Sequence, residues 1–325
     1  MAVRNVRHLL LPIFLFGAPP AALAVEGPTA AGPIGGTDIR SALLPPPGVY
    51  GGVIGAVAQA FEFVDGSGDT IPILADGDLR KWVAGPFVYF VPDAKVLGGS
   101  VGVGAIVPLE QQCGHLFLLE PSACMSGNGD PYVEIDWSRS FGTLRPSKYP
   151  GAYPILQGLT VLTGFGVVFP VGTYDGLTPT SQALSIGNNT WDFAPTFGFT
   201  YTTRPILAEG TELSFRFFWN NYLENPFTHY SAGDLLDFEF ALTERIGRIQ
   251  VGVTGFYAFQ DEDDEILGVR VPPDGRRAKN LELGPVVNYD IPALNSSIKI
   301  KGLTTLVTEN TVQSWAIVAG WVRKF

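Results

Sequence analysis

Alternation between apolar and charged residues constrains the fold of this chain more than any other feature of its sequence. In several runs the side chains change character at every second position, which is the period of a β-strand. Three runs show it most sharply: Leu213, Phe215, Phe217 and Trp219 against Ser214, Arg216 and Asn220; Leu236, Phe238, Phe240 and Leu242 against Asp237 and Glu239; and Ile298 and Ile300 against Lys299 and Lys301. The pattern predicts strands with one apolar face and one charged face.

Two architectures can use such strands. In a soluble sandwich the apolar faces pack inward, whereas in a membrane barrel they face lipid and the charged faces line the lumen. In the barrel we expect a charged and aromatic lumen lining made of Arg216, Asp237, Glu239, Lys299 and Lys301, with Phe218 and Phe256 as apolar positions.

Similar runs repeat along the chain and are separated by turn residues. Loops after odd-numbered runs are mostly long and those after even-numbered runs mostly short, which is typical of outer-membrane barrels. The sequence therefore predicts an all-β fold, a transmembrane antiparallel up-and-down β-barrel of about twelve strands with both termini in the periplasm. The runs are Val49–Val64, Lys81–Val91, Val96–Val107, Tyr132–Phe141, Leu156–Phe169, Trp191–Tyr201, Glu212–Tyr222, Leu235–Thr243, Gly247–Gln260, Lys279–Tyr289, Ser297–Val307 and Val312–Phe325.

Composition supports a membrane protein without a membrane helix. Hydrophobic residues make up 46% of the chain and charged residues only 16%, against about a quarter in soluble proteins. The long uncharged stretch Tyr149–Tyr174 contains several Gly and Pro residues that a helix would tolerate badly. The formal net charge of −10 also argues against nucleic acid as a partner, because phosphate contacts need basic surface.

The N-terminus predicts export. Arg4 and Arg7 precede the short apolar run Leu9–Phe16, and Ala22-Leu23-Ala24 is a small-x-small cleavage signal. We expect a cleaved signal peptide over residues 1–24 and the Gram-negative outer membrane as the location. Residues 25–47 are rich in Gly, Pro and Ala and form either a periplasmic tail or a peptide folded into the lumen. Residues 48–325 would form the barrel.

The two cysteines, Cys113 and Cys124, are close in the sequence. In an oxidising compartment they are expected to form a disulfide within a loop. A metal site would need further ligands, and His115 is the only nearby candidate.

The last run carries tryptophans at opposite ends of an apolar band and ends on an aromatic residue. It resembles the closing strand of bacterial outer-membrane barrels, which implies recognition of Phe325 by the barrel-insertion machinery, although Arg323 departs from the usual apolar residue. Aromatic residues at strand ends typically sit at the membrane interface. The expected membrane anchors, in contact with outer-membrane lipid or lipopolysaccharide, are Trp191, Trp219, Trp315, Trp321 and Phe325.

Several phrases resemble the family of envelope proteins associated with the meta-pathway of phenol degradation. They are Phe169-Pro170-Val171-Gly172-Thr173-Tyr174-Asp175; Gly187-Asn188-Asn189 with Trp191; Glu224-Asn225 with Thr228, Tyr230, Gly233 and Asp234; Leu283-Gly284-Pro285 with Tyr289; and, more loosely, Asp38, Pro45–Gly48 and Gly98-Gly99. The resemblance implies an outer-membrane channel for hydrophobic or aromatic substrates. One departure is Ala232, where family members tend to carry Ser.

Two motifs suggest other chemistry. His229 and Ser231 would share one face of a strand and could form a nucleophile and base, as in outer-membrane lipid hydrolases, but no orienting Asn or Gln follows. The acidic run from Asp261 to Glu265, with Asp261, Asp263 and Asp264 as weak candidate ligands, could bind a divalent cation, although such runs are usually solvated.

We therefore expect a channel through which small hydrophobic or aromatic compounds enter, with selectivity from a narrow lumen and its paired charges and without a cofactor. The alternatives are a lipid hydrolase that uses His229 and Ser231, and a barrel whose loops have a structural or adhesive role.

Overall fold

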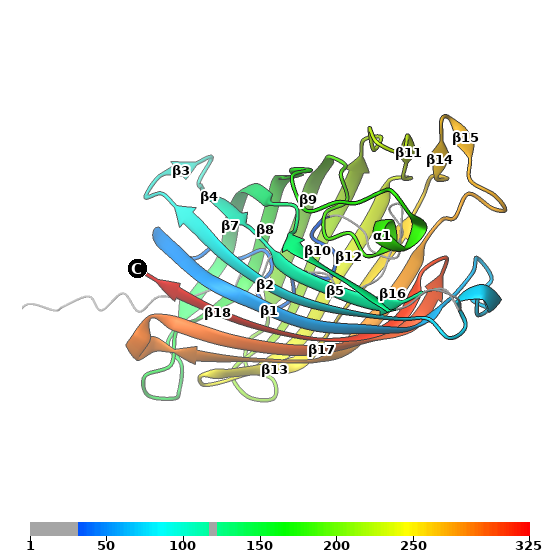
Figure 1. Cartoon of the computed structure of the whole chain (residues 1–325). Helices are drawn as coiled ribbons and strands as arrows, with labels where there is room; N and C mark the ends of the chain where they lie inside the picture. The colour runs from blue at the N-terminus through cyan, green and yellow to red at the C-terminus, as the bar shows by residue number, and fades with distance from the viewer. Residues whose placement is uncertain (1–31, 117–121) are drawn as a thin grey trace, which may run out of the picture.

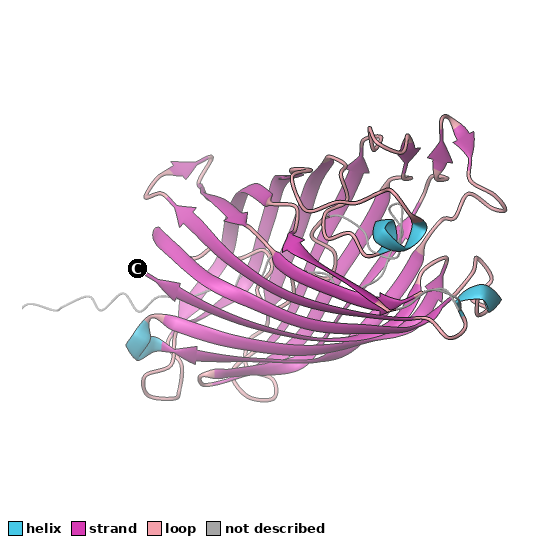
Figure 2. Cartoon of the chain, viewed as in Figure 1, coloured by secondary structure: helices cyan, strands magenta, loops and turns pink. Residues whose placement is uncertain are grey.

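Strongly tilted strands curve around a common axis and form a barrel (Figures 1 and 2). The computed structural model describes residues 32–116 and 122–325, and the predicted signal peptide lies outside them. Helical structure in the described residues is limited to the 3-10 turns Pro72–Leu74 and Pro292–Leu294 and to the helix α1, Pro179–Ala183. No helix in that part of the chain is both apolar enough and long enough to cross a membrane.

Twelve long strands pair antiparallel in chain order, so the prediction of an all-β barrel is confirmed. The barrel closes where β1 pairs with β18, with Tyr50 opposite Lys324, and where β2 pairs with β4. The strands are β1 Gly48–Phe63, β2 Asp78–Val91, β4 Gly99–Ile106, β7 Tyr132–Arg145, β8 Ile155–Val168, β9 Asp192–Thr202, β10 Thr211–Tyr222, β12 Leu235–Ile246, β13 Ile249–Gln260, β16 Lys279–Ile291, β17 Ser296–Glu309 and β18 Val312–Lys324.

Six short strands accompany them. β3 (Lys95–Val96) forms a small hairpin with β4 at the barrel end that also holds the C-terminus. At the other end, β11 (Tyr230–Ser231), β14 (Glu265–Ile266) and β15 (Val269–Arg270) form a separate three-stranded sheet. The remaining two, β5 (Leu109–His115) and β6 (Ala123–Asn128), extend the wall of the barrel itself.

The prediction of a long loop at Pro108–Pro131 is wrong, because β5 and β6 occupy most of it. β5 continues the pairing of β4 with β2: Ile106 lies opposite Phe87, and three positions on, Leu109 lies opposite Ala84. The wall therefore grows by one long hairpin. The sequence pattern missed it because Pro108 and Pro131 read as strand ends.

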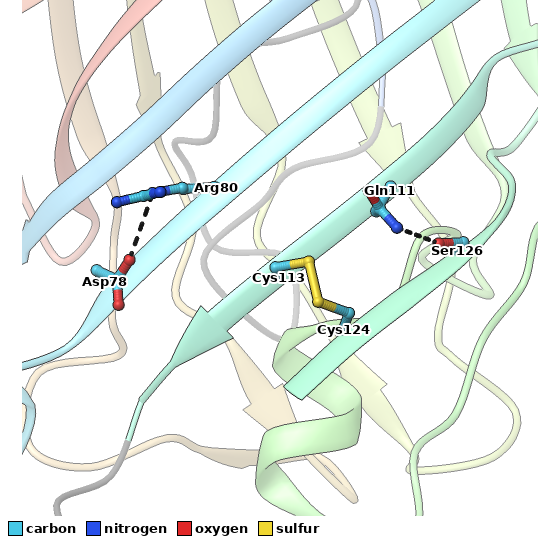
Figure 3. The surroundings of a disulfide bond; sticks show 6 residues. All are labelled: Asp78, Arg80, Gln111, Cys113, Cys124 and Ser126. Atoms are coloured by element: carbon cyan, nitrogen blue, oxygen red, sulfur yellow. Dashed lines mark hydrogen bonds and ion pairs between the residues drawn. A yellow bond between two sulfur atoms is a disulfide. The ribbon is translucent and has the colours of Figure 1, made fainter. Parts of the chain in front are cut away.

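Cys113 and Cys124 lie directly opposite each other in this hairpin and form a disulfide (Figure 3). Two residue pairs away, the side chain of Gln111 donates to the hydroxyl of Ser126 over 3.0 Å. The disulfide thus ties two paired strands, whereas the sequence suggested a tie within a loop.

The two faces of the strands differ as the alternation requires. On β10, Leu213 is 43% exposed while Arg216 is only 1% exposed, and on β17 Ile300 is 46% exposed while Lys299 is 1% exposed. On these strands, apolar side chains thus cover the outside, and ionisable ones lie inside. The arrangement suits lipid outside, since lipid offers no partner to a charge.

Aromatic rings reinforce the outer face. Phe199, Phe215, Phe238 and Phe259 pack ring against ring across four neighbouring strands, with centroids 5.5 to 6.2 Å apart. The five expected anchor residues are also exposed, from 37% at Trp315 to 74% at Phe325. Their role at the membrane interface stays a prediction.

Replacing both Cys113 and Cys124 by Ser should loosen the β5–β6 hairpin without opening the barrel. The bridge closes a short segment, with a sequence separation of 11, for which chain entropy accounts for about 2–3 kcal/mol. Limited proteolysis should cleave the variant in the hairpin faster than the wild type. Heat-dependent gel migration, which reports barrel closure, should not change; if it did, the hairpin would be essential to the wall.

Candidate functional site in the barrel lumen

Residues 32–47, here called the inner segment, run inside the barrel before β1 begins (dark blue in Figure 1). The side chains of Ile34, Ile39 and Ala42 are at most 2% exposed. Gly35 has a φ of +63°, and a Cβ on it would lie 2.8 Å from the ring of Phe256. Glycine is therefore required where this segment passes the wall.

Carboxylates of β12 hold the first part of the inner segment. The backbone N–H groups of Gly36 and Thr37 each donate to the carboxylate of Glu239 over 2.5 Å, and the Thr37 hydroxyl donates to it as well. The N–H of Gly35 donates more weakly to Asp237, at 3.4 Å. The two acids of β12 predicted to line the lumen thus accept hydrogen bonds from the backbone and the Thr37 hydroxyl of the inner segment.

Asp38 occupies the centre of a buried charge cluster. It forms ion pairs with Lys299 and, at 3.1 Å, with Lys301, and the Lys301 ammonium also donates to the carbonyl of Gly35 over 2.6 Å. Burial alone would raise the pKa of the Asp38 carboxyl, but the two ammonium groups outweigh it and hold that pKa below its ordinary value. Asp38 is therefore ionised at neutral pH.

Arg40 fastens the segment farther along. Its backbone N–H donates to Glu212 over 2.8 Å, and its guanidinium donates to the side chain of Gln250 over 3.0 Å. Asp290 lies 3.5 Å from the same guanidinium and 2.6 Å from that of Arg245. The inner segment thus supplies both an anion, Asp38, and a cation, Arg40, to oppositely charged side chains of the wall.

A second charge cluster belongs to the wall alone. Arg216 reaches Glu134 at 2.8 Å and Asp136 at 2.9 Å, and its guanidinium lies 4.7 Å from the ring centre of Phe218. The hydroxyl of Tyr132 donates to Glu134 over 2.6 Å. Since every member is buried, pairing and hydrogen bonding must replace the lost hydration.

The five charged residues expected to line the lumen are all buried inside the barrel, but with partners that the sequence did not suggest. The acids Glu134 and Asp136, which hold Arg216, alternate within the run Tyr132–Phe141, so the period-two rule could have found them. Asp38 lies in a stretch without period, where no signal of this kind exists.

The lumen changes character toward the end that carries the long loops. There Ile34, Tyr222, Phe256 and Leu303 belong to one apolar cluster, which also takes in Leu184 and Val271 from the loops. Phe218 and Phe256, the predicted apolar lumen positions, are 1% and 0% exposed.

The candidate hydrolytic pair does not have the predicted geometry. His229 has a φ of +56°, which is not extended, so the expectation that it shares a strand face with Ser231 is wrong. Its ring instead meets the carboxylate of Glu224 at 2.7 Å, and both side chains are half exposed. Ser231 lies in β11, paired with Glu265.

The acidic loop does not assemble a metal site. Asp263 pairs with Arg270 at 2.7 Å and Arg277 at 2.5 Å, whereas Asp264 is buried and accepts from the N–H of Gly233 over 2.9 Å. Over residues 32–116 and 122–325, no group of three or more His, Cys, Asp or Glu is placed to hold a metal ion.

The chain is similar to several solved structures. An outer-membrane channel from Pseudomonas putida F1 matches with a TM-score of 0.68 and 13% identity, over 89% of this chain and 100% of that one. The transport unit of the autotransporter AIDA-I from Escherichia coli matches at 0.48 and 10%, over 89% and 93%. A mutant of TodX, a monoaromatic hydrocarbon channel, matches at 0.38 and 10%, over 86% and 91%.

At 13% identity the Pseudomonas structure shows a shared barrel fold. The apolar outer face is what the predicted location in the Gram-negative outer membrane requires. No curated protein matches the chain. A family model described as "Putative MetA-pathway of phenol degradation" matches residues 60–319, which is most of the chain. The chain therefore belongs to this family, as its sequence phrases suggested.

Proposed function

We propose that this protein is an outer-membrane channel for the uptake of small hydrophobic or aromatic compounds. The observation that carries the proposal is the apolar cluster inside one end of the lumen, around Tyr222, Phe256 and Leu303. Such side chains give a nonpolar solute a path that water-filled pores lack. Membership of a family described by phenol degradation supports the same substrate class.

Selectivity would come from the narrow lumen and its paired charges. In barrels of about eight strands, side chains fill the lumen, whereas barrels of about sixteen strands leave an aqueous channel. A barrel of about twelve strands is therefore expected to have a lumen of intermediate width. The pairs of Asp38 and Arg216 with their partners narrow the path further. Large hydrophilic solutes would be excluded because they cannot replace these contacts.

We also propose that both termini face the periplasm. The start of β1 and the end of β18 meet at one end of the barrel, where Tyr50 lies opposite Lys324. The long loops lie at the other end and would face outward, in contact with lipopolysaccharide. Phe325, with its ring exposed and its N–H donating to Val49 over 3.0 Å, would remain accessible to the insertion machinery.

An enzymatic role is the weaker alternative. The ring of His229 contacts Glu224, and the backbone of His229 is not extended. Glu224 could orient this imidazole, but the left-handed backbone at His229 does not place it on a strand face with Ser231. Hydrolysis of lipid that disappeared on Ser231→Ala would nevertheless replace the channel proposal. A purely adhesive barrel would show neither transport nor hydrolysis.

Purified protein in liposomes should speed the entry of benzyl alcohol relative to protein-free vesicles, and should not do so for glucose. The physical reason is that only the first solute gains from the apolar part of the lumen. Entry is measured by trapping the solute with an enclosed oxidising enzyme. Equal rates for the alcohol with and without protein would overturn the proposal.

Asp38→Asn should release the inner segment and raise single-channel conductance. The variant leaves Lys299 and Lys301 without their shared anion. A hydrogen bond to a charged group contributes about 1.5–3 kcal/mol, so its loss should lower the ratio of bound to released inner segment roughly tenfold or more. Asp263→Asn, which removes a carboxylate from an exposed loop pair, is the matched control. Unchanged conductance in Asp38→Asn would show that other contacts hold the segment.

Acid should open the wild-type channel in the same way. Because the pKa of Asp38 in the folded protein lies below its ordinary value of 3.8, its pairing stabilises the seated segment above that value. The stabilisation is lost as the pH falls below about 3.8. Conductance recorded from neutral to acid pH should therefore rise only at the acid end. The rise in conductance that comes from protonation of Asp38 should be absent in Asp38→Asn.

A further inference from the structure

Within residues 32–116 and 122–325, four buried oxygen atoms near the loop end of the lumen accept no hydrogen bond of normal geometry. They are both carboxylate oxygens of Asp192, the side-chain oxygen of Asn220 and one carboxylate oxygen of Asp237. All three side chains are 0% exposed. A buried carboxylate without a donor loses its hydration and gains nothing in return, so this arrangement is costly unless something else fills it.

The strand register brings these three residues together. Asp192 lies opposite Tyr222, so Asn220 is its diagonal neighbour on β10. Asp237 lies opposite Phe218, so it is in turn a diagonal neighbour of Asn220 on β12. Diagonal neighbours on one face of a sheet have Cβ atoms about 7–8 Å apart or less. The acceptors therefore form one cluster across three adjacent strands.

Gly32 shows where the acceptors converge. A Cβ on this glycine would lie 2.6 Å from the side-chain oxygen of Asn220 and equally 2.6 Å from an oxygen of Asp192. Both side chains thus point at one place beside the inner segment, where the absence of a side chain at Gly32 lets the backbone of the segment lie against their buried oxygens. The neighbouring ring of Tyr222 adds an aromatic wall that suits a cation.

We propose that Asp192, Asn220 and Asp237 form a binding site for the primary ammonium group of a solute with an apolar tail. An ammonium group carries three donors and one positive charge, which matches a cluster of carboxyl and amide oxygens that can accept hydrogen bonds. An alcohol brings a single donor, and a carboxylate would be repelled. The tail would lie in the adjoining apolar cluster of Tyr222 and Phe256. This inference rests on the proposed function and narrows its substrate class.

Three solutes with the same ring test the proposal: benzylammonium, benzyl alcohol and benzoate. Their affinities for the full mature protein in detergent are measured at neutral pH by titration calorimetry. We expect benzylammonium to bind at least about tenfold more tightly than benzyl alcohol, as for a hydrogen bond to a charged group, and benzoate to bind least. Asp192→Asn should lower the ratio of the first two affinities about tenfold, and Asn220→Asp, which adds a carboxylate of the same size, should raise it.

Asp263→Asn in the exposed loop removes one charge elsewhere and should leave the ratio unchanged. Equal affinities for benzylammonium and benzyl alcohol would overturn the ammonium site. An affinity ratio that stays unchanged in both Asp192→Asn and Asn220→Asp would overturn it as well. The proposal would also be overturned if sodium or calcium ions displaced benzylammonium with an equal affinity, because the cluster would then be a site for inorganic cations. If benzyl alcohol still enters protein-containing liposomes faster than protein-free vesicles in these cases, the channel proposal stands without the ammonium site.

Discussion

Buried charge is the constraint on which the rest of this structure depends. A barrel with lipid outside must turn its polar side chains inward, and a narrow lumen then removes them from water as well. Arg216 meets this constraint with Glu134 and Asp136 from the wall. Lys299 and Lys301 meet it with Asp38, which the wall does not supply. The inner segment thus supplies the anion that these wall lysines need, and it also occupies part of the lumen.

The same constraint relates the two candidate features of the lumen. Where the inner segment brings an anion or a guanidinium, the wall charges are paired, as at Asp38 and Arg40. Where the described part of the segment brings only glycine, at Gly32, buried oxygens of Asp192 and Asn220 accept no hydrogen bond of normal geometry from described residues. A site that accepts a passing solute must be left incomplete by the protein itself. The cluster beside Gly32 satisfies that requirement, while the cluster around Asp38 does not.

How much of this followed from the sequence depends on whether a residue sits in a periodic run. Leu213 and Arg216 were placed on opposite faces correctly because strands in a barrel have only two environments, lipid and lumen. The pairing of Lys299 with Asp38 could not be read in this way, since the two residues are separated by 261 positions and one lies outside any strand. The β5–β6 hairpin was missed for a local reason, because Pro108 interrupts a strand that resumes in the same register.

The separation between Asp38 and Lys299 also bears on how the molecule is made. The inner segment comes first in the chain, yet its partners Glu212, Glu239 and Lys299 belong to strands that follow β9. Contacts between such distant positions carry a large loop-closure entropy and form slowly. During assembly the newly exported chain must therefore keep Asp38 and Arg40 hydrated until the last strands arrive. The finished lumen is thus narrowed from within by a segment that precedes every strand of the barrel wall.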